Sequence, residues 1–142
     1  MSSSSMLLLE GKKIFILEDD VNNLAIITSM LRRYGATIYF DSWGVETAQT
    51  IKAFSPIDLI LLDIHLPGGV TGYDVYDAIQ EVPELAGIPI VAVTASDPDQ
   101  EMKKAREKGF KGYISKPIRT KSFIKSILAI LEGEEVWGAI GT

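Results

Sequence analysis

The hydrophobic residues of this chain fall into short apolar runs separated by longer amphipathic segments. Runs of this length, bounded by polar residues or glycine, predict buried strands, and they cover residues 12–17, 36–40, 59–62, 88–93 and 110–115. The segments that follow repeat apolar residues every three or four positions, which predicts helices. Strands that alternate with helices in this way indicate an α/β fold, a doubly wound five-stranded parallel sheet in a (βα)5 arrangement.

Capping residues and apolar faces give further detail on the start or the burial of three predicted helices. Thr71 and Asp74 have the spacing of a capping box at the start of the third helix. In the fourth helix only Met102 and Ala105 could face a core, and a helix that buries so little is easily displaced. The last helix covers about residues 120–132 and carries a continuous apolar face.

Polar residues stand where the predicted strands end. Right-handed crossovers bring the carboxyl ends of parallel strands to one edge of the sheet, and open α/β folds bind ligands at that edge. The residues gathered there are Glu18, Asp19, Asp63, Thr94 and Lys116. Each of them alone could be a helix cap or a solvated loop residue, but their convergence indicates a functional site.

The charges in this set favour phosphoryl-transfer chemistry. Three neighbouring carboxylates repel one another, and oxygen ligands of this kind suit Mg²⁺ with several waters retained. An aspartate can attack phosphorus and form an aspartyl-phosphate, so we expect Asp63 to be the nucleophile. We expect Glu18 and Asp19 to hold Mg²⁺, which contacts one phosphoryl oxygen. Lys116 and Thr94 would then contact the other two oxygens.

Composition excludes several other classes of protein. With 142 residues, 46% of them hydrophobic, the chain suits one compact domain over residues 11–132, with a leader at 1–10 and a tail at 133–142. The net charge of −5 argues against a nucleic-acid partner. The absence of cysteine excludes disulfides and thiolate sites. No apolar run approaches the ~20 residues that span a bilayer, so we expect a cytoplasmic protein without a membrane partner.

Four segments of the chain read FILEDD (15–20), LILLDIHLP (59–67), IVAVTAS (90–96) and GYISKPI (112–118). In this order they resemble the receiver domains of response regulators in two-component signalling, especially the single-domain chemotaxis-regulator type, over about residues 12–132. The resemblance implies a flavodoxin-like sheet of strand order 2-1-3-4-5. It also implies phosphorelay signal transduction by a stand-alone receiver that is not an enzyme, beyond catalysing its own phosphoryl transfer and dephosphorylation.

The resemblance assigns roles to individual residues. The phosphoacceptor is Asp63. The Mg²⁺ ligands are Glu18, Asp19, Asp63 and the backbone carbonyl of His65. The switch residues are Thr94, Lys116 and Tyr113, and the residues that tune dephosphorylation are His65 and Ser96. The Lys116–Pro117 peptide bond is expected to be cis.

The resemblance also implies two kinds of protein partner. The phosphoryl donor is a phosphohistidine on a sensor histidine kinase or a histidine phosphotransfer protein. A downstream protein would bind the face made by the fourth helix, the fifth strand and the fifth helix. Phosphorylation would remodel this face as Thr94 moves toward Asp63 and Tyr113 fills the space that it leaves.

Two features depart from the family pattern. Four residues instead of three separate Pro67 from Gly72, which leaves the path of that loop open. His65 is the sole histidine, and we interpret it as a rim residue because no orienting partner for a catalytic imidazole is identifiable.

Alternative functions make different demands on the sequence. A haloacid-dehalogenase-like phosphohydrolase would need a second aspartate where His65 stands. A flavodoxin-like flavin carrier would need a phosphate loop where Glu18 and Asp19 would repel phosphate. A degenerate receiver that acts only as a binding scaffold would not need the full set of site residues. In the tail, Trp137 could either contact a partner or fold back onto its own domain.

Overall fold

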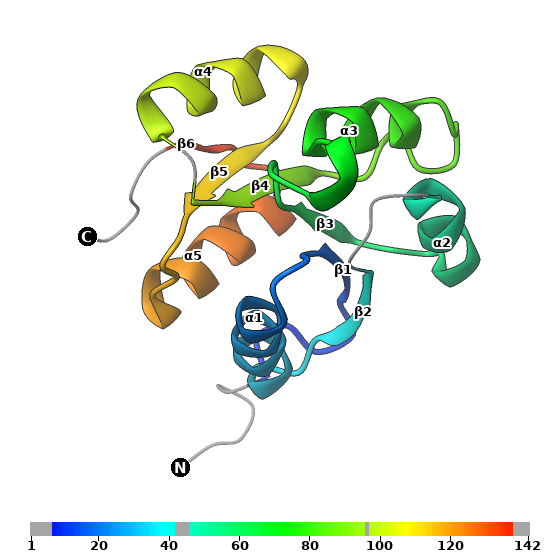
Figure 1. Cartoon of the computed structure of the whole chain (residues 1–142). Helices are drawn as coiled ribbons and strands as arrows, with labels where there is room; N and C mark the ends of the chain where they lie inside the picture. Colours follow the sequence, from blue (N-terminus) through cyan, green and yellow to red (C-terminus); the bar gives the residue numbers. More distant parts are fainter. Residues whose placement is uncertain (1–6, 42–45, 96, 138–142) are drawn as a thin grey trace.

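A parallel β-sheet with helices on both faces forms the body of the protein (Figure 1). The computed structural model describes residues 7–41, 46–95 and 97–137. The strands are β1 (Lys13–Leu17), β2 (Thr37–Asp41), β3 (Leu59–Leu62), β4 (Ile90–Thr94), β5 (Gly112–Ser115) and β6 (Val136–Trp137). The helices are α1 (Val21–Arg33), α2 (Thr47–Phe54), α3 (Gly72–Gln80), α4 (Pro98–Lys108) and α5 (Thr120–Leu131), with a short 3₁₀ turn η2 (Pro67–Gly69).

The sheet order confirms the predicted α/β fold and extends it by one strand. The order is β2-β1-β3-β4-β5-β6, and every neighbouring pair is parallel. The sequence predicted five strands, whereas the sheet has six. Strand β6 was missed because its two residues follow a charged turn and are too short to show a period.

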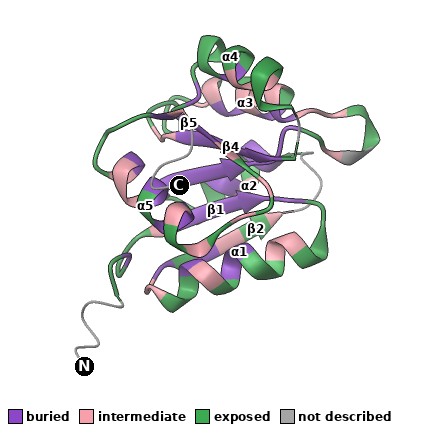
Figure 2. Cartoon of the chain, turned by 90° about the vertical axis from the view of Figure 1, so that its left-hand side faces the viewer, coloured by how far each residue is buried: buried purple, intermediate pink, exposed green. Residues whose placement is uncertain are grey.

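Two apolar clusters, one on each face of the sheet, make up the core. Figure 2 shows the buried strands of the sheet, with the more exposed helices around them. Helices α1 and α5 cover one face, where Ile27, Leu31 and Phe123 meet the sheet. Helices α2, α3 and α4 cover the other, where Ile51 and Val75 do so. The strands β3 and β4 are buried along their whole length, as expected of central strands in a doubly wound sheet.

The capping box predicted for α3 is present, and a side chain also caps α4. The Asp74 N–H donates to Thr71 Oγ1 at 3.2 Å, and the Thr71 N–H donates to Asp74 Oδ2 at 3.0 Å, which completes the capping box of α3. Asp97 caps α4 by accepting from the Asp99 N–H at 3.0 Å. In α4 itself Ala105 is buried and no other residue of the helix is, so the prediction of a weakly buried helix is confirmed.

Residues next to the predicted leader and tail boundaries pack against the domain. Leu9 is fully buried and its N–H donates to the Tyr34 carbonyl at 2.8 Å, although the sequence suggested a polar leader. Trp137 folds back onto its own domain and is half-buried, which decides between the two alternatives. The limits of leader and tail stay predictions. None of the helices in residues 7–41, 46–95 and 97–137 is long and apolar enough to span a membrane.

Candidate functional site

The predicted site residues meet at the carboxyl edge of the sheet, where backbone hydrogen bonds hold them in place. The pairing of the strands continues one residue beyond their ends: the Glu18 N–H donates to the Asp41 carbonyl at 3.1 Å, and the Asp63 N–H donates to the Leu17 carbonyl at 3.0 Å. The Lys116 N–H donates to the Thr94 carbonyl at 3.0 Å. Each functional side chain therefore starts from a backbone position that the sheet fixes.

Three carboxylates form a compact oxygen cluster at this edge. Carboxylate oxygens of Glu18, Asp19 and Asp63 lie within 4.8 Å of one another. Glu18 is only 2% exposed and Asp63 only 6%, whereas Asp19 is exposed. The cluster thus has a buried floor of two carboxylates and one side that is open to solvent.

Lys116 supplies the positive charge of the site. Its Nζ lies 2.5 Å from Glu18 Oε1 and 3.1 Å from Asp63 Oδ2, and its side chain is 10% exposed. The Lys116–Pro117 peptide bond that follows is cis. One ammonium group therefore links the ends of β1 and β3 from the loop that follows β5.

Backbone amides hold the other oxygen of each buried carboxylate. Glu18 Oε2 accepts from the Asp20 N–H at 3.1 Å, and Asp63 Oδ1 accepts from the His65 N–H at 3.1 Å. Both carboxylates are thus fixed between a lysine and a peptide N–H, which orients them before any ligand binds.

Burial and neighbouring charges shift the pKa values of Glu18 and Lys116. Burial raises the pKa of Glu18 above its ordinary value, against the lowering effect of its hydrogen bonds to Lys116 and Asp20. Burial by itself would lower the pKa of Lys116, but the carboxylates of Glu18 and Asp63 outweigh it and raise that pKa. Lys116 therefore stays protonated at neutral pH, and Glu18 is costly to keep ionised.

The donor set fits a hard divalent cation. The cluster of Glu18, Asp19 and Asp63 offers only oxygen ligands, and Mg²⁺ prefers one or two carboxylates together with water. The exposed carboxylate of Asp19 leaves the room that such waters need. The expected contribution of the His65 carbonyl stays a prediction, since the contact seen for His65 is that of its N–H with Asp63.

The expected switch residues lie close by along the sheet. Thr94 is fully buried at the end of β4, and Tyr113 is buried on β5, opposite Ala92. The His65 side chain is exposed, as a rim residue should be, and Ser96 lies outside the described residues. The proposed switching and tuning roles stay predictions.

The loop from Asp63 to α3 makes a tight turn through two glycines. Gly68 and Gly69 adopt φ values of 75° and 80° within the turn η2, which glycine tolerates without strain. His65 and Thr71 form an antiparallel bridge below the turn. At its base, a Cβ on Gly72 would lie 2.6 Å from the Asp63 carbonyl oxygen, so the loop is closed tightly there.

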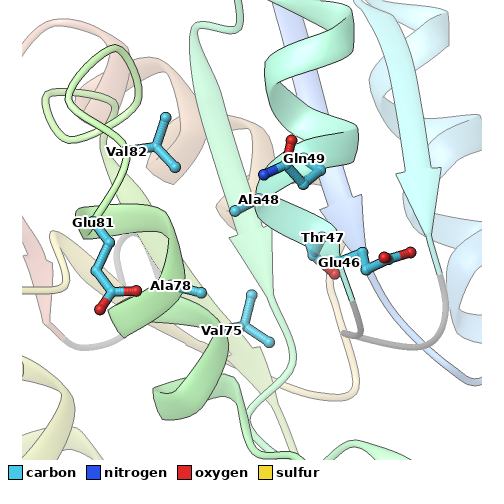
Figure 3. Close-up of a pocket in the computed structure, with 8 residues that line it drawn as sticks. All are labelled: Glu46, Thr47, Ala48, Gln49, Val75, Ala78, Glu81 and Val82. Carbon is cyan, nitrogen blue, oxygen red and sulfur yellow. The ribbon is translucent and has the colours of Figure 1, made fainter.

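Two surface hollows were not foreseen from the sequence. A groove of about 660 Å³ runs from Glu18 and Asp19 along α1, between exposed Val21 and Phe40. Its signal in the sequence is faint, because isolated exposed apolar residues are common. A smaller pocket of about 260 Å³ lies between α2 and α3 and shares no residue with the carboxylate cluster (Figure 3).

Comparisons with known proteins agree with this geometry. A family model described as the response regulator receiver domain matches residues 14–128. Relatives include the polar-differentiation response regulators DivK of Brucella ovis and Brucella anthropi. Each is 33% identical over 120 residues, which covers 84% of this chain and 96% of the relative.

Solved receiver structures have the same architecture. The N-terminal domain of a response regulator/sensory box/GGDEF three-domain protein from Carboxydothermus hydrogenoformans matches with a TM-score of 0.74 at 29% identity, over 85% of this chain and 94% of that one. The receiver domain of a sensor histidine kinase from Pseudomonas aeruginosa matches with a TM-score of 0.75 at 26% identity, over 87% of this chain and 99% of that one. Its structure holds a magnesium ion coordinated in the active site cleft.

Proposed function

This chain belongs to the response-regulator receiver family, and we propose that Asp63 is the residue on which it accepts a phosphoryl group. The observation that carries the proposal is the position of Lys116 Nζ, 2.5 Å from Glu18 Oε1 and 3.1 Å from Asp63 Oδ2. A lysine held between two buried carboxylates is placed to contact a phosphoryl oxygen when the group arrives on Asp63. Phosphoryl transfer depends mainly on such positioning and charge neutralisation.

In the proposed reaction a carboxylate oxygen of Asp63 attacks the phosphorus of a phosphohistidine. The new O–P bond forms as the N–P bond of the donor breaks, and the released imidazole takes up a proton. Glu18, Asp19 and Asp63 would hold Mg²⁺, which would supply positive charge to neutralise the carboxylates and a phosphoryl oxygen. Lys116 pairs with a second phosphoryl oxygen, and the Thr94 hydroxyl donates to a third.

The donor class follows from the family, as a sensor histidine kinase or a histidine phosphotransfer protein. The groove beside α1 supports a docking position for it, because the groove begins at Glu18 and Asp19 and is lined by apolar residues that include Val21, which is 77% exposed. A donor helix that packs there would present its phosphohistidine to Asp63.

Labelling with a small-molecule phosphodonor tests the acceptor. With Mg²⁺ and acetyl phosphate, intact-mass spectrometry should show one added phosphoryl group that is stable in acid and lost in base. Asp63→Asn should abolish the addition. Asp58→Asn is the matched control, because Asp58 precedes β3 at the opposite end from Asp63 and its carboxylate accepts a hydrogen bond from the Lys13 N–H. A label on His65 instead of Asp63 would overturn the assignment.

A second variant separates docking from chemistry. Val21→Asp should slow transfer from a phosphorylated kinase domain while leaving labelling by acetyl phosphate unchanged. Ile26→Asp, also an exposed apolar position of α1 but outside the groove lining, serves as the control. Equal effects of the two variants would argue against the groove as the docking position.

A further inference from the structure

Strand β6 occupies the outer edge of β5 from within the same chain. Val136 pairs with Gly112 and Trp137 with Tyr113 in parallel register, and Figure 1 shows β6 beside β5 between α4 and α5. The Val136 N–H donates to the Lys111 carbonyl at 3.0 Å. The last strand of the predicted sheet therefore has no free edge along these two pairs.

The contact is closely fitted on the α5 side of the sheet. Val136 is 2% exposed and belongs to the same apolar cluster as Ile130. A Cβ on Gly112 would lie 2.9 Å from the Val136 carbonyl oxygen, so β6 approaches β5 this closely because residue 112 is glycine. The Glu134 N–H also donates to the Ala129 carbonyl at 3.0 Å and ties the connecting turn to α5.

On the opposite side β6 is held by α4. The guanidinium carbon of Arg106 lies 4.6 Å from the centroid of the Trp137 ring, a cation–π contact. The indole N–H of Trp137 donates to Glu135 Oε1 at 2.8 Å, which holds the ring in this orientation. Trp137 thus forms a bridge from the β5 edge to α4.

Polar contacts also join α4 to α3. On its α3 side, the Tyr73 hydroxyl donates to Glu101 Oε2 at 3.1 Å, and Lys108 Nζ lies 2.8 Å from Asp77 Oδ1. Ala105 is the one buried residue of α4, and Met102 packs partly buried against the same apolar cluster. The partly exposed polar pairs that add to this small apolar contact contribute little each. Through the contact of Arg106 with Trp137, any displacement of α4 would act on β6.

We propose that β6 is an intramolecular cap on the outer edge of β5, and that residues 133–137 are released from this edge when α4 is displaced. Because Arg106 and Trp137 join the cap to α4, displacement of α4 weakens the cap, and a released cap frees α4 to the same extent. This inference rests on the proposed function for its trigger, phosphorylation of Asp63, but the cap and its link to α4 are independent of it.

Trp137 provides a direct probe of the cap. In a Trp43→Phe background, which leaves Trp137 as the single tryptophan, acrylamide quenching reports its accessibility. Hydrogen exchange of the Val136 N–H reports the strand pairing. Addition of beryllofluoride with Mg²⁺, as a phosphoryl mimic, should shift the ratio of released to bound cap by about fivefold or more, the lower end of usual coupling between sites. Both readouts should change together.

Two substitutions in α4 test the link without the phosphoryl mimic. Arg106→Gln should raise the quenching of Trp137 and the exchange rate of Val136, whereas Lys103→Gln, at an exposed position of the same helix, should change neither. If Arg106→Gln leaves both readouts at the parental value, the link is refuted.

The remaining outcomes separate the two proposals. If Asp63 takes up a phosphoryl group but the quenching of Trp137 and the exchange of the Val136 N–H stay unchanged, the cap is not regulated and the proposed function still holds. Loss of uptake with a normal Arg106→Gln response would refute the proposed function and leave the cap with its link to α4.

Discussion

Replacing Lys116 with Met should cost this protein a large part of its stability in the absence of metal. The substitution keeps an unbranched side chain of similar length but removes the charge between Glu18 and Asp63, whose side chains are 2% and 8% exposed. Removing one partner of a buried ion pair typically costs about 3–5 kcal/mol. The free energy of unfolding of a natural domain is about 5–15 kcal/mol. For a chain of this size the melting temperature should fall by about 6–20 °C.

Chemical and thermal unfolding in EDTA would measure this effect. Lys52→Met is the matched control, because Lys52 Nζ pairs with Glu84 Oε2 at 3.2 Å but both side chains are more than half exposed, and such a pair is worth at most about 1 kcal/mol. Adding Glu18→Gln to the Lys116 variant should recover part of the loss, since it removes one of the two facing charges. Millimolar Mg²⁺ should stabilise the Lys116 variant through mass-action binding to the folded state.

The pH dependence of the loss has a definite sign. Burial already raises the pKa of Glu18 above the ordinary value of 4.5, and removal of Lys116 favours the protonated form further. When the pKa of a carboxyl is higher in the folded protein than in the unfolded chain, the free energy of unfolding falls as pH rises between these two pKa values. The difference in the free energy of unfolding between the unmodified protein and the Lys116 variant should therefore become smaller as pH falls toward 4.5. A loss no larger than that of Lys52→Met, at neutral pH, would refute the view that Lys116 neutralises the buried carboxylates.

The other predictions concern the metal, a buried hydroxyl and a glycine. Mg²⁺ should raise the melting temperature of the unmodified protein through binding to the folded state. Asp19→Asn should reduce this rise without lowering the stability of the metal-free protein, because the substitution relieves repulsion among the carboxylates. An Asp19→Asn variant that responds to Mg²⁺ as the unmodified protein does would contradict the assignment of Asp19 as a ligand. The Thr47 hydroxyl lines the pocket of Figure 3 and is buried without a hydrogen-bond partner among the described residues. Thr47→Val should therefore stabilise the fold by about 1 kcal/mol in urea unfolding, while Thr50→Val, which loses a bond to a backbone carbonyl, should not. Gly72→Ala should cost about 1–3 kcal/mol in the same assay, because its Cβ would collide with backbone at the end of β3, whereas Gly87→Ala meets open space and should be nearly neutral.

The fold class and the place of the site were both readable from the order of apolar and polar residues in the chain. The apolar runs at residues 14–17, 59–62 and 90–93 are short and uninterrupted, and such runs predict strands that are buried on both faces of a sheet. Parallel strands share a carboxyl edge, and the convergence of Glu18, Asp63 and Lys116 follows from their place in the chain. Local pairs such as the capping box of α3 were also readable, because both partners lie within one turn.

How strongly these groups interact, and which segments cover the sheet, depends on packing between distant parts of the chain. The contact of Lys116 with Asp63 joins residues 53 positions apart, and whether it is a loose or a buried ion pair depends on packing that no local pattern encodes. The burial of Leu9 and the pairing of β6 with β5 have the same cause. Both segments are too short to show a hydrophobic period in the sequence. Their structure depends instead on tertiary contacts, which the core provides for Leu9 and the open edge of β5 provides for β6.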